Sequence, residues 1–210
     1  GNGYMNVFIG QRTGFANKSG SDNVFVGSYS GSAIQSGFKN VFIGTSSGAN
    51  AISGNDNTVI GYAAANKMEK GGNVVLGSLD APDTKGEYKC YLVHLVAYQN
   101  RLGNRNLFLG FGAGYSNNGS DNVFLGHSAG ANQVGSNRLC IDVTGTTSPL
   151  IYGEFDNRIV RINGMCHIND VLKLSPRATP PDNPSDGMIY LDNSSGYKLK
   201  VYNGTQWLDL

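Results

Sequence analysis

Residues 6–10 read Asn-Val-Phe-Ile-Gly, and this string decides the fold because it returns along most of the chain. Clear copies begin at Asn23, Asn40, Asn57, Asn73, Asn106 and Asn122. A degenerate copy at Lys89 fills the one long gap, and a last copy begins at Arg138. The nine starts are 16 or 17 residues apart, and a glycine lies three residues before eight of them. Such a fixed period is the signature of a repeat architecture.

Each repeat predicts short strands joined by turns. The apolar run is too short for a helix and is rich in β-branched and aromatic residues, which favours a strand. Its last glycine suits a bend with positive φ. We expect a second short strand in the small residues that follow, as in 28–33 (SYSGSA), and a turn in 20–23 (GSDN). The sequence therefore predicts an all-β fold, a parallel β-solenoid of about nine rungs, roughly 40 Å long at ~4.8 Å per stacked strand.

The alternation of side chains along the string predicts two faces. Positions two and four share one face, which we assign to the interior of the coil, and position three points the other way. Position three then forms an aromatic-rich stripe that exceeds the apolar area soluble monomers usually expose. We expect chains to associate along this stripe, unless a later part of the same chain covers it. The expected contact residues are Phe8, Phe25, Phe42, Tyr91, Phe108 and Phe124.

The polar residues that recur with the repeat favour structural roles. Stacked asparagine side chains can hydrogen-bond from rung to rung and cap the backbone of turns, although a column of amides could instead bind sugars. Asp22, Asp56 and Asp121 occupy the turns and each offers a single carboxylate, which favours turn capping over calcium binding. We expect no metal and no cofactor in the repeats.

These repeats resemble the head repeats of YadA-type trimeric autotransporter adhesins, whose units read similarly around a VAIG core. They are more similar still to tail-fibre and cell-surface proteins of Bacteroidetes and of their phages or contractile injection systems. Three later strings share the second resemblance: residues 149–164 (PLIYGEFDNRIVRING), 168–181 (INDVLKLSPRATPP) and 187–210 (GMIYLDNSSGYKLKVYNGTQWLDL). The resemblance implies a left-handed β-roll, a homotrimer meeting along the aromatic stripe, an extracellular location, and attachment to a cell-surface glycan or protein receptor. It carries no catalytic residues.

The period stops near Ser148, and four regions are expected. Residues 1–147 form the β-roll repeat domain, 148–175 a β-hairpin or stalk region, 176–187 a Pro-rich linker, and 188–210 a C-terminal β-meander. Asp156-Asn157 marks the hairpin turn, and residues 167–174 (HINDVLKL) suggest one more strand. The meander is too small to be stable alone, so we expect it to pack within the trimer.

Composition excludes several other classes of protein. Lys and Arg total 16 against 15 Asp and Glu, a net charge of +1, which gives no electrostatic case for nucleic acid or an anionic membrane as partner. No apolar run approaches the ~20 residues of a membrane-spanning helix, so we expect no membrane insertion. The cysteines make neither a disulfide framework nor a metal site, and the histidines share no metal spacing. These residues are Cys90, Cys140, Cys166, His94, His127 and His167.

Binding is expected where the repeat is broken, because regular rungs present only a repeated surface of Gly, Ser and Asn. Two such places are residues 78–98 and the C-terminal meander, where exposed aromatics could contact a receptor. The candidate receptor contacts are Asp80, Asp83, Glu87, Tyr98 and Trp207, with the meander's own core as the alternative role of Trp207. We predict a non-enzymatic attachment protein. The alternatives are a tail spike that cleaves glycans with two carboxylates and a purely structural subunit of an extracellular filament.

Overall fold

A computed structural model describes residues 3–79, 83–97, 99 and 102–210. The chain forms two compact units, Gly1–Met165 and Cys166–Leu210. Throughout the described residues, regular secondary structure consists of β-strands, and no helix there is long and apolar enough to cross a bilayer.

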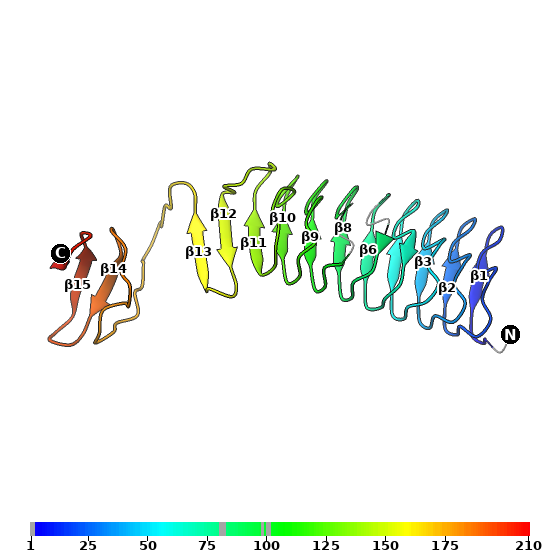
Figure 1. Cartoon of the computed structure of the whole chain (residues 1–210), viewed down its shortest axis with the longest axis horizontal. Helices are drawn as coiled ribbons and strands as arrows, with labels where there is room; N and C mark the ends of the chain where they lie inside the picture. The colour runs from blue at the N-terminus through cyan, green and yellow to red at the C-terminus, as the bar shows by residue number, and fades with distance from the viewer. Residues whose placement is uncertain (1–2, 80–82, 98, 100–101) are drawn as a thin grey trace. The chain divides into compact units, whose positions relative to one another are not determined.

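The first unit is the predicted parallel β-solenoid (Figure 1). In its described residues one strand per rung stacks on the next, and equivalent residues pair in register, as Val24 with Val41 and Phe25 with Phe42. The nine strands therefore delimit eight complete coils of the solenoid, each 16 or 17 residues long. The nine strands are β1 (Val7–Ile9), β2 (Val24–Val26), β3 (Val41–Ile43), β4 (Thr58–Ile60), β6 (Val74–Leu76), β8 (Cys90–Leu92), β9 (Leu107–Leu109), β10 (Val123–Leu125) and β11 (Arg138–Ile141).

Position three of each string lies inside the coil, so the face assignment made from alternation is wrong. From β2 onward this position is fully buried: Phe25, Phe42, Val59, Val75, Tyr91, Phe108, Phe124 and Cys140. Phe8 in β1 is partly exposed but stacks on Phe25, with 5.0 Å between ring centroids. The aromatics expected at a subunit contact, Phe8, Phe25, Phe42, Tyr91, Phe108 and Phe124, therefore form the interior column of their own chain.

The width of the coil explains why the rings lie inside. A Cβ added to Gly31, in the turn opposite β2, would lie 2.7 Å from the ring of Phe25, so one ring already spans the coil. The rings of Phe25 and Phe42 lie 4.9 Å apart, which matches the spacing of stacked strands. Alternation shows which residues share a face, but it does not show which face is inside.

The small residues after each strand form stacked turns where a second strand was expected, and that expectation is wrong. Tyr29 and Gly31 have φ near +58° and +56°, which a strand does not contain. Rungs are still joined here by backbone hydrogen bonds, since the Gly31 N–H donates to the Ser47 oxygen at 2.9 Å. A short second pair occurs among the described residues where the repeat is irregular, between β5 (Lys67–Met68) and β7 (Asp83–Thr84).

The asparagine column is a buried hydrogen-bond ladder, as the structural interpretation predicted. The backbone N–H and the side-chain amide of Asn40 both donate to Asn23 Oδ1, at 3.0 and 3.1 Å. Its Nδ2 also donates to the Gly54 oxygen at 2.9 Å, and its own Oδ1 accepts from Asn57. Each amide therefore caps a turn and joins two rungs, and its burial leaves it no surface for a sugar.

The antiparallel elements follow the solenoid in sequence. β12 (Ile151–Glu154) and β13 (Ile159–Ile162) form the predicted hairpin, and β12 pairs with β11 so that the hairpin extends the same sheet. In the second unit, β14 (Ile189–Asp192), β15 (Lys198–Tyr202) and β16 (Trp207–Asp209) form the predicted meander. The strand expected at residues 167–174 is absent from the described chain, where that segment is irregular and mostly exposed.

Replacing Phe42 by Ala should lower the free energy of unfolding by about 3–5 kcal/mol, because it empties a buried position between the ring of Phe25 and the side chain of Val59. Phe15→Ala is the matched control, since that ring is 77% exposed and its loss should change stability by less than about 0.5 kcal/mol. Chemical unfolding followed by circular dichroism measures both. Equal losses in the two variants would contradict the interior assignment.

Candidate functional site

The outer face of the solenoid sheet carries an aliphatic surface that its own chain leaves uncovered. Because position three points inward, positions two and four of each strand point outward, and we call this surface the outward stripe. Its most exposed members are Val7, Ile9, Ile43, Ile60, Leu107 and Leu109. The pairing register places Ile43 beside Ile60 and Leu107 beside Val123, so the stripe continues from rung to rung.

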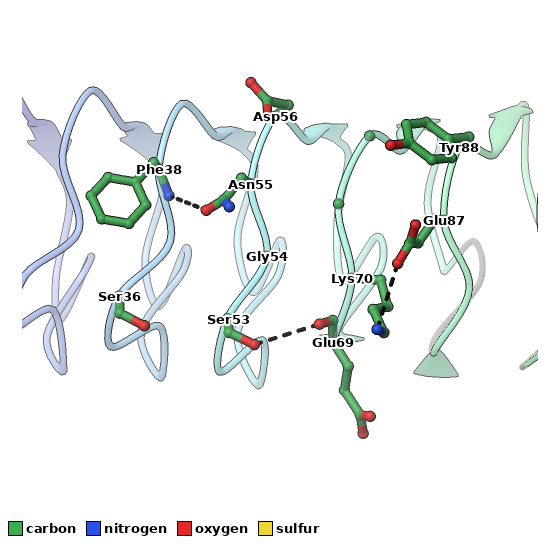
Figure 2. A pocket seen from close by; sticks show the side chains of 12 residues that line it. Ser36, Phe38, Ser53, Gly54, Asn55, Asp56, Glu69, Lys70, Glu87 and Tyr88 are labelled. Atoms are coloured by element: carbon green, nitrogen blue, oxygen red, sulfur yellow. Dashed lines mark hydrogen bonds and ion pairs between the residues drawn. The ribbon is translucent and has the colours of Figure 1, made fainter.

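A groove interrupts the turns that precede the strands. The residue two places before each string is Phe38, Asn55, Gly71, Glu87 and Asn104 in successive rungs, and the residue one place before is Lys39, Asp56, Gly72, Tyr88 and Arg105. Only the rung of β6 has glycine at both places, so its turn has no side chain to fill the surface. A hollow of about 500 Å³ results. Its lining residues are Ser36, Phe38, Ser53, Gly54, Asn55, Asp56, Glu69, Lys70, Gly71, Gly72, Glu87 and Tyr88 (Figure 2).

Aromatic rings mark the two ends of this groove. Figure 2 shows Phe38 at one end and Tyr88 at the other, with the glycine turn between them. Phe38 is 41% exposed and Tyr88 is 65% exposed. A Cβ added to Gly72 would lie 2.6 Å from Cδ1 of Tyr88, so the Tyr88 ring rests directly against the glycine. With its φ of +72° as well, Gly72 is the residue that allows Tyr88 its position.

Charged side chains of both signs line the space between the rings. Lys70 Nζ lies 3.5 Å from Glu87 Oε1, and Figure 2 marks this pair with a dashed line. From the neighbouring hollow, Lys85 Nζ lies 3.7 Å from Glu69 Oε1. All four side chains are partly exposed, so these pairs contribute little to stability. Asp56 makes no ion pair within the described residues, and its carboxylate stands at the rim. The groove therefore offers hydrogen-bond acceptors and donors that contribute little to the stability of the fold.

A second hollow of about 320 Å³ continues the groove toward β9. It shares Lys70, Glu87 and Tyr88 with the first hollow. At its far side the guanidinium of Arg105 donates to both carboxylate oxygens of Asp121, at 2.7 and 2.8 Å. The guanidinium of Arg105 is thus already paired with a carboxylate of the next rung. The polar groups with capacity to bind a ligand are therefore those of the first hollow.

The structure separates the residues expected to contact a receptor. Glu87 lines the groove, and Asp83 lies on β7. Asp80 and Tyr98 lie outside the described residues. Trp207 packs in the C-terminal sheet, where its ring meets Tyr190 edge-on at 4.7 Å, which agrees with the role of a core anchor.

Other groove residues were missed in the sequence, although one signal points to them. Phe38, Asp56 and Tyr88 belong to turns that appear regular when each repeat is taken alone. The string Lys-Gly-Gly at 70–72 is the signal. It is the one place where the glycine three residues before the repeated string is lost, since Lys70 stands there, and two glycines follow instead, in a repeat shortened to 16 residues.

Cys90 and Cys140 fit the role of small apolar residues, whereas Cys166 is exposed. Cys140 occupies the interior column, and burial raises its pKa to about 11. Cys90 is half-buried on the sheet, and burial raises its pKa too. Thiols with raised pKa values are poor nucleophiles at neutral pH. Within the described residues, no group of three or more His, Cys, Asp or Glu is placed to hold a metal ion.

Comparisons of the chain with family models, with curated proteins and with solved structures found no match. Function is therefore inferred from the chain's own residues. Two surfaces carry that inference, the outward stripe and the groove over Gly71 and Gly72. They use different columns of the repeat, and no residue belongs to both.

The groove side chains should be dispensable for folding. We expect Tyr88→Ala and Glu87→Gln each to change the free energy of unfolding by less than about 1 kcal/mol, because both side chains are at least partly exposed and the ion pair of Glu87 is solvated. Chemical unfolding of the two variants beside the unaltered chain measures the effect. A loss comparable with that of Phe42→Ala would assign these residues to the fold and not to a binding surface.

Proposed function

We propose that this chain is a non-enzymatic segment of a homotrimeric extracellular fibre or adhesin, which attaches to a cell surface through a glycan or protein receptor. The observation that carries the proposal is the outward stripe. An aliphatic surface that recurs on every rung resembles the inner face of a two-layer protein with one layer missing. Further copies of the same chain supply that layer with matching length and spacing.

The outward stripe takes the place of the aromatic column as the contact between subunits. Its Val, Ile and Leu side chains sit in register on a regular sheet, so the sheets of neighbouring subunits could pack face to face. The number three comes from the resemblance of the repeats and of the C-terminal strings to trimeric adhesins and tail fibres. The meander is a second reason to expect association, because a unit as small as Cys166–Leu210 has too little core to be more than marginally stable alone.

Attachment is supported by the contrast between the regular rungs and the groove. A parallel stack whose every rung is fixed to the next by backbone and amide hydrogen bonds is a rigid support. One interruption of that support provides polar groups and exposed rings of the kind that recognise ligands. We place the receptor contacts there, with Glu87 as the expected contact that lines the groove.

Two aspartates in the outward stripe should dissociate the trimer. In sedimentation velocity we expect the unaltered chain to have the mass of three 22.3 kDa chains and Ile43→Asp/Ile60→Asp to have the mass of one. The reason is that carboxylates on neighbouring rungs cannot be buried in an apolar contact without losing their hydration.

Ile52→Asp is the matched control for this experiment. Ile52 is 53% exposed but lies in a turn outside the stripe, so its variant should remain trimeric. Circular dichroism should show an unchanged β-fold in all three proteins. A monomeric unaltered chain, or equal dissociation of the control, would contradict the proposed assembly.

Glycan cleavage is the second candidate, because three acidic residues, Asp56, Glu69 and Glu87, line the groove. Glycosidases use a pair of carboxylates, one of them protonated. Attachment is favoured because Glu69 and Glu87 each pair with a different lysine and their carboxylates point away from one another (Figure 2). New reducing ends after incubation with oligosaccharides would favour cleavage. Sedimenting species larger than trimers, without cell binding, would favour a structural filament subunit.

A further inference from the structure

We propose that the groove over Gly71 and Gly72 binds a short neutral oligosaccharide, with Tyr88 stacking on a sugar ring and Asp56, Lys70 and Glu87 bonding its hydroxyls. This inference deepens the proposed attachment function by naming a site and a class of ligand. It rests on four properties of the groove: its length, its exposed rings, its polar groups and its net charge.

The dimensions of the groove suit a short chain of sugars. Phe38 and Tyr88 lie in turns three rungs apart, which is ~14 Å at the spacing of stacked strands. A single monosaccharide would reach only one of the two rings, whereas a short oligosaccharide lying along the rungs reaches both. The hollow of about 500 Å³ is also within the range of ligand-binding pockets.

The ring of Tyr88 is both supported by the backbone and open to solvent, so it can stack on a ligand. Its ring rests against the backbone of Gly72, where no side chain intervenes, and 65% of the residue remains exposed. A ring packed against the backbone in this way presents apolar surface and has less rotational freedom to lose on binding. The apolar face of a pyranose ring, lined with C–H groups, is the natural complement to such a surface.

The polar groups match hydroxyls. A carboxylate accepts hydrogen bonds through two oxygens, and each ammonium donates three, so the pair of Lys70 and Glu87 keeps spare capacity on both partners. Ser53 and Asn55 add further donors and acceptors to the lining. A sugar hydroxyl donates and accepts at once, and it can bridge neighbouring groups of opposite character.

The charge balance favours a neutral sugar over an acidic one. Among the residues that line the first hollow, Asp56, Glu69 and Glu87 carry three negative charges and Lys70 carries one positive charge, a net charge of −2. An anionic sugar would meet the unpaired carboxylate of Asp56 at the rim. A peptide is also disfavoured, because the groove offers neither a free strand edge nor a deep apolar pocket in its described lining.

The test measures the binding of four defined sugars to the full chain by isothermal calorimetry. The neutral probes are cellotriose, maltotriose and chitotriose, and the acidic probe is trigalacturonic acid. We expect at least one neutral probe to bind and the acidic probe to bind more weakly. The bound sugar should be recovered intact.

Three variants assign the binding to the groove. Tyr88→Ala should weaken the affinity about tenfold or more. Gly72→Ala should weaken it as well, because the added Cβ would displace the Tyr88 ring while leaving it present. Tyr62→Ala is the matched control, since Tyr62 is 58% exposed but does not line the groove, and its affinity should stay within about twofold of the original.

The outcomes separate this inference from the proposed function. Binding of no neutral probe, stronger binding of the acidic probe, or equal effects of Tyr88→Ala and Tyr62→Ala would overturn the saccharide site. Binding of a peptide in the groove would overturn it too. Sedimentation of the same samples reports the trimer independently, so an intact trimer that binds no sugar refutes the site alone. Dissociated chains that still bind sugar refute the assembly alone.

Discussion

The buried asparagine ladder is the interaction on which the rest of the structure depends. From Asn23 to Asn73 each amide bonds along the stack to the preceding asparagine and also to a turn carbonyl, as Asn40 does to Asn23 and to Gly54. A slip of one residue would leave the donors and acceptors of a buried amide without partners, which costs about 1–3 kcal/mol for each group. The ladder therefore fixes the register, and a fixed register turns every position of the repeat into a straight column.

The columns then have separate physical requirements. The interior column needs volume, and within a rung that volume is shared between the strand and the turn that faces it. Where the strand supplies Phe42, the turn supplies Gly48, whose Cβ would meet the ring at 2.6 Å. Where the strand supplies the smaller Val59, the turn supplies Ala65 and the rung buries Met68 as well. A smaller side chain on the strand is thus offset by larger side chains in the same rung. The pairing register of the strands is the same in these rungs as in the others.

The ladder also tolerates a residue other than asparagine within the stack, in the irregular rung. Lys89 stands in the asparagine column and is buried, with its backbone N–H still donating to Asn73 Oδ1 at 3.1 Å. Its ammonium lies 5.7 Å from the ring centroid of Tyr91, within the range of a cation–π contact. The backbone part of the ladder survives here without the amide. The neighbouring turns are the ones that depart from the repeat, and the groove opens among them.

The sequence was sufficient to predict the features that follow from the repeat period. It was not sufficient to predict which side chains point into the coil. The strand starts, the parallel register, the hairpin at Asp156-Asn157 and the meander all follow from spacing or from turn residues. The buried face did not, because alternation is symmetric and both Phe42 and Ile43 are apolar. The expected second strand was also wrong, because nothing in the local sequence indicates that Tyr29 adopts a positive φ. Only the tertiary stack imposes it.

The groove exists because residues at one position of the repeat can change while the other positions keep their interactions. Loss of two side chains at Gly71 and Gly72 hollows the turn, while the next residue, Asn73, keeps its bonds to Asn57 Oδ1 at 3.0 and 3.1 Å. A turn column can therefore change without disturbing the ladder, the interior or the outward stripe. In a solenoid built this way, assembly and recognition need not compete for residues. This independence is why the outward stripe and the groove can be tested with separate variants of one folded protein.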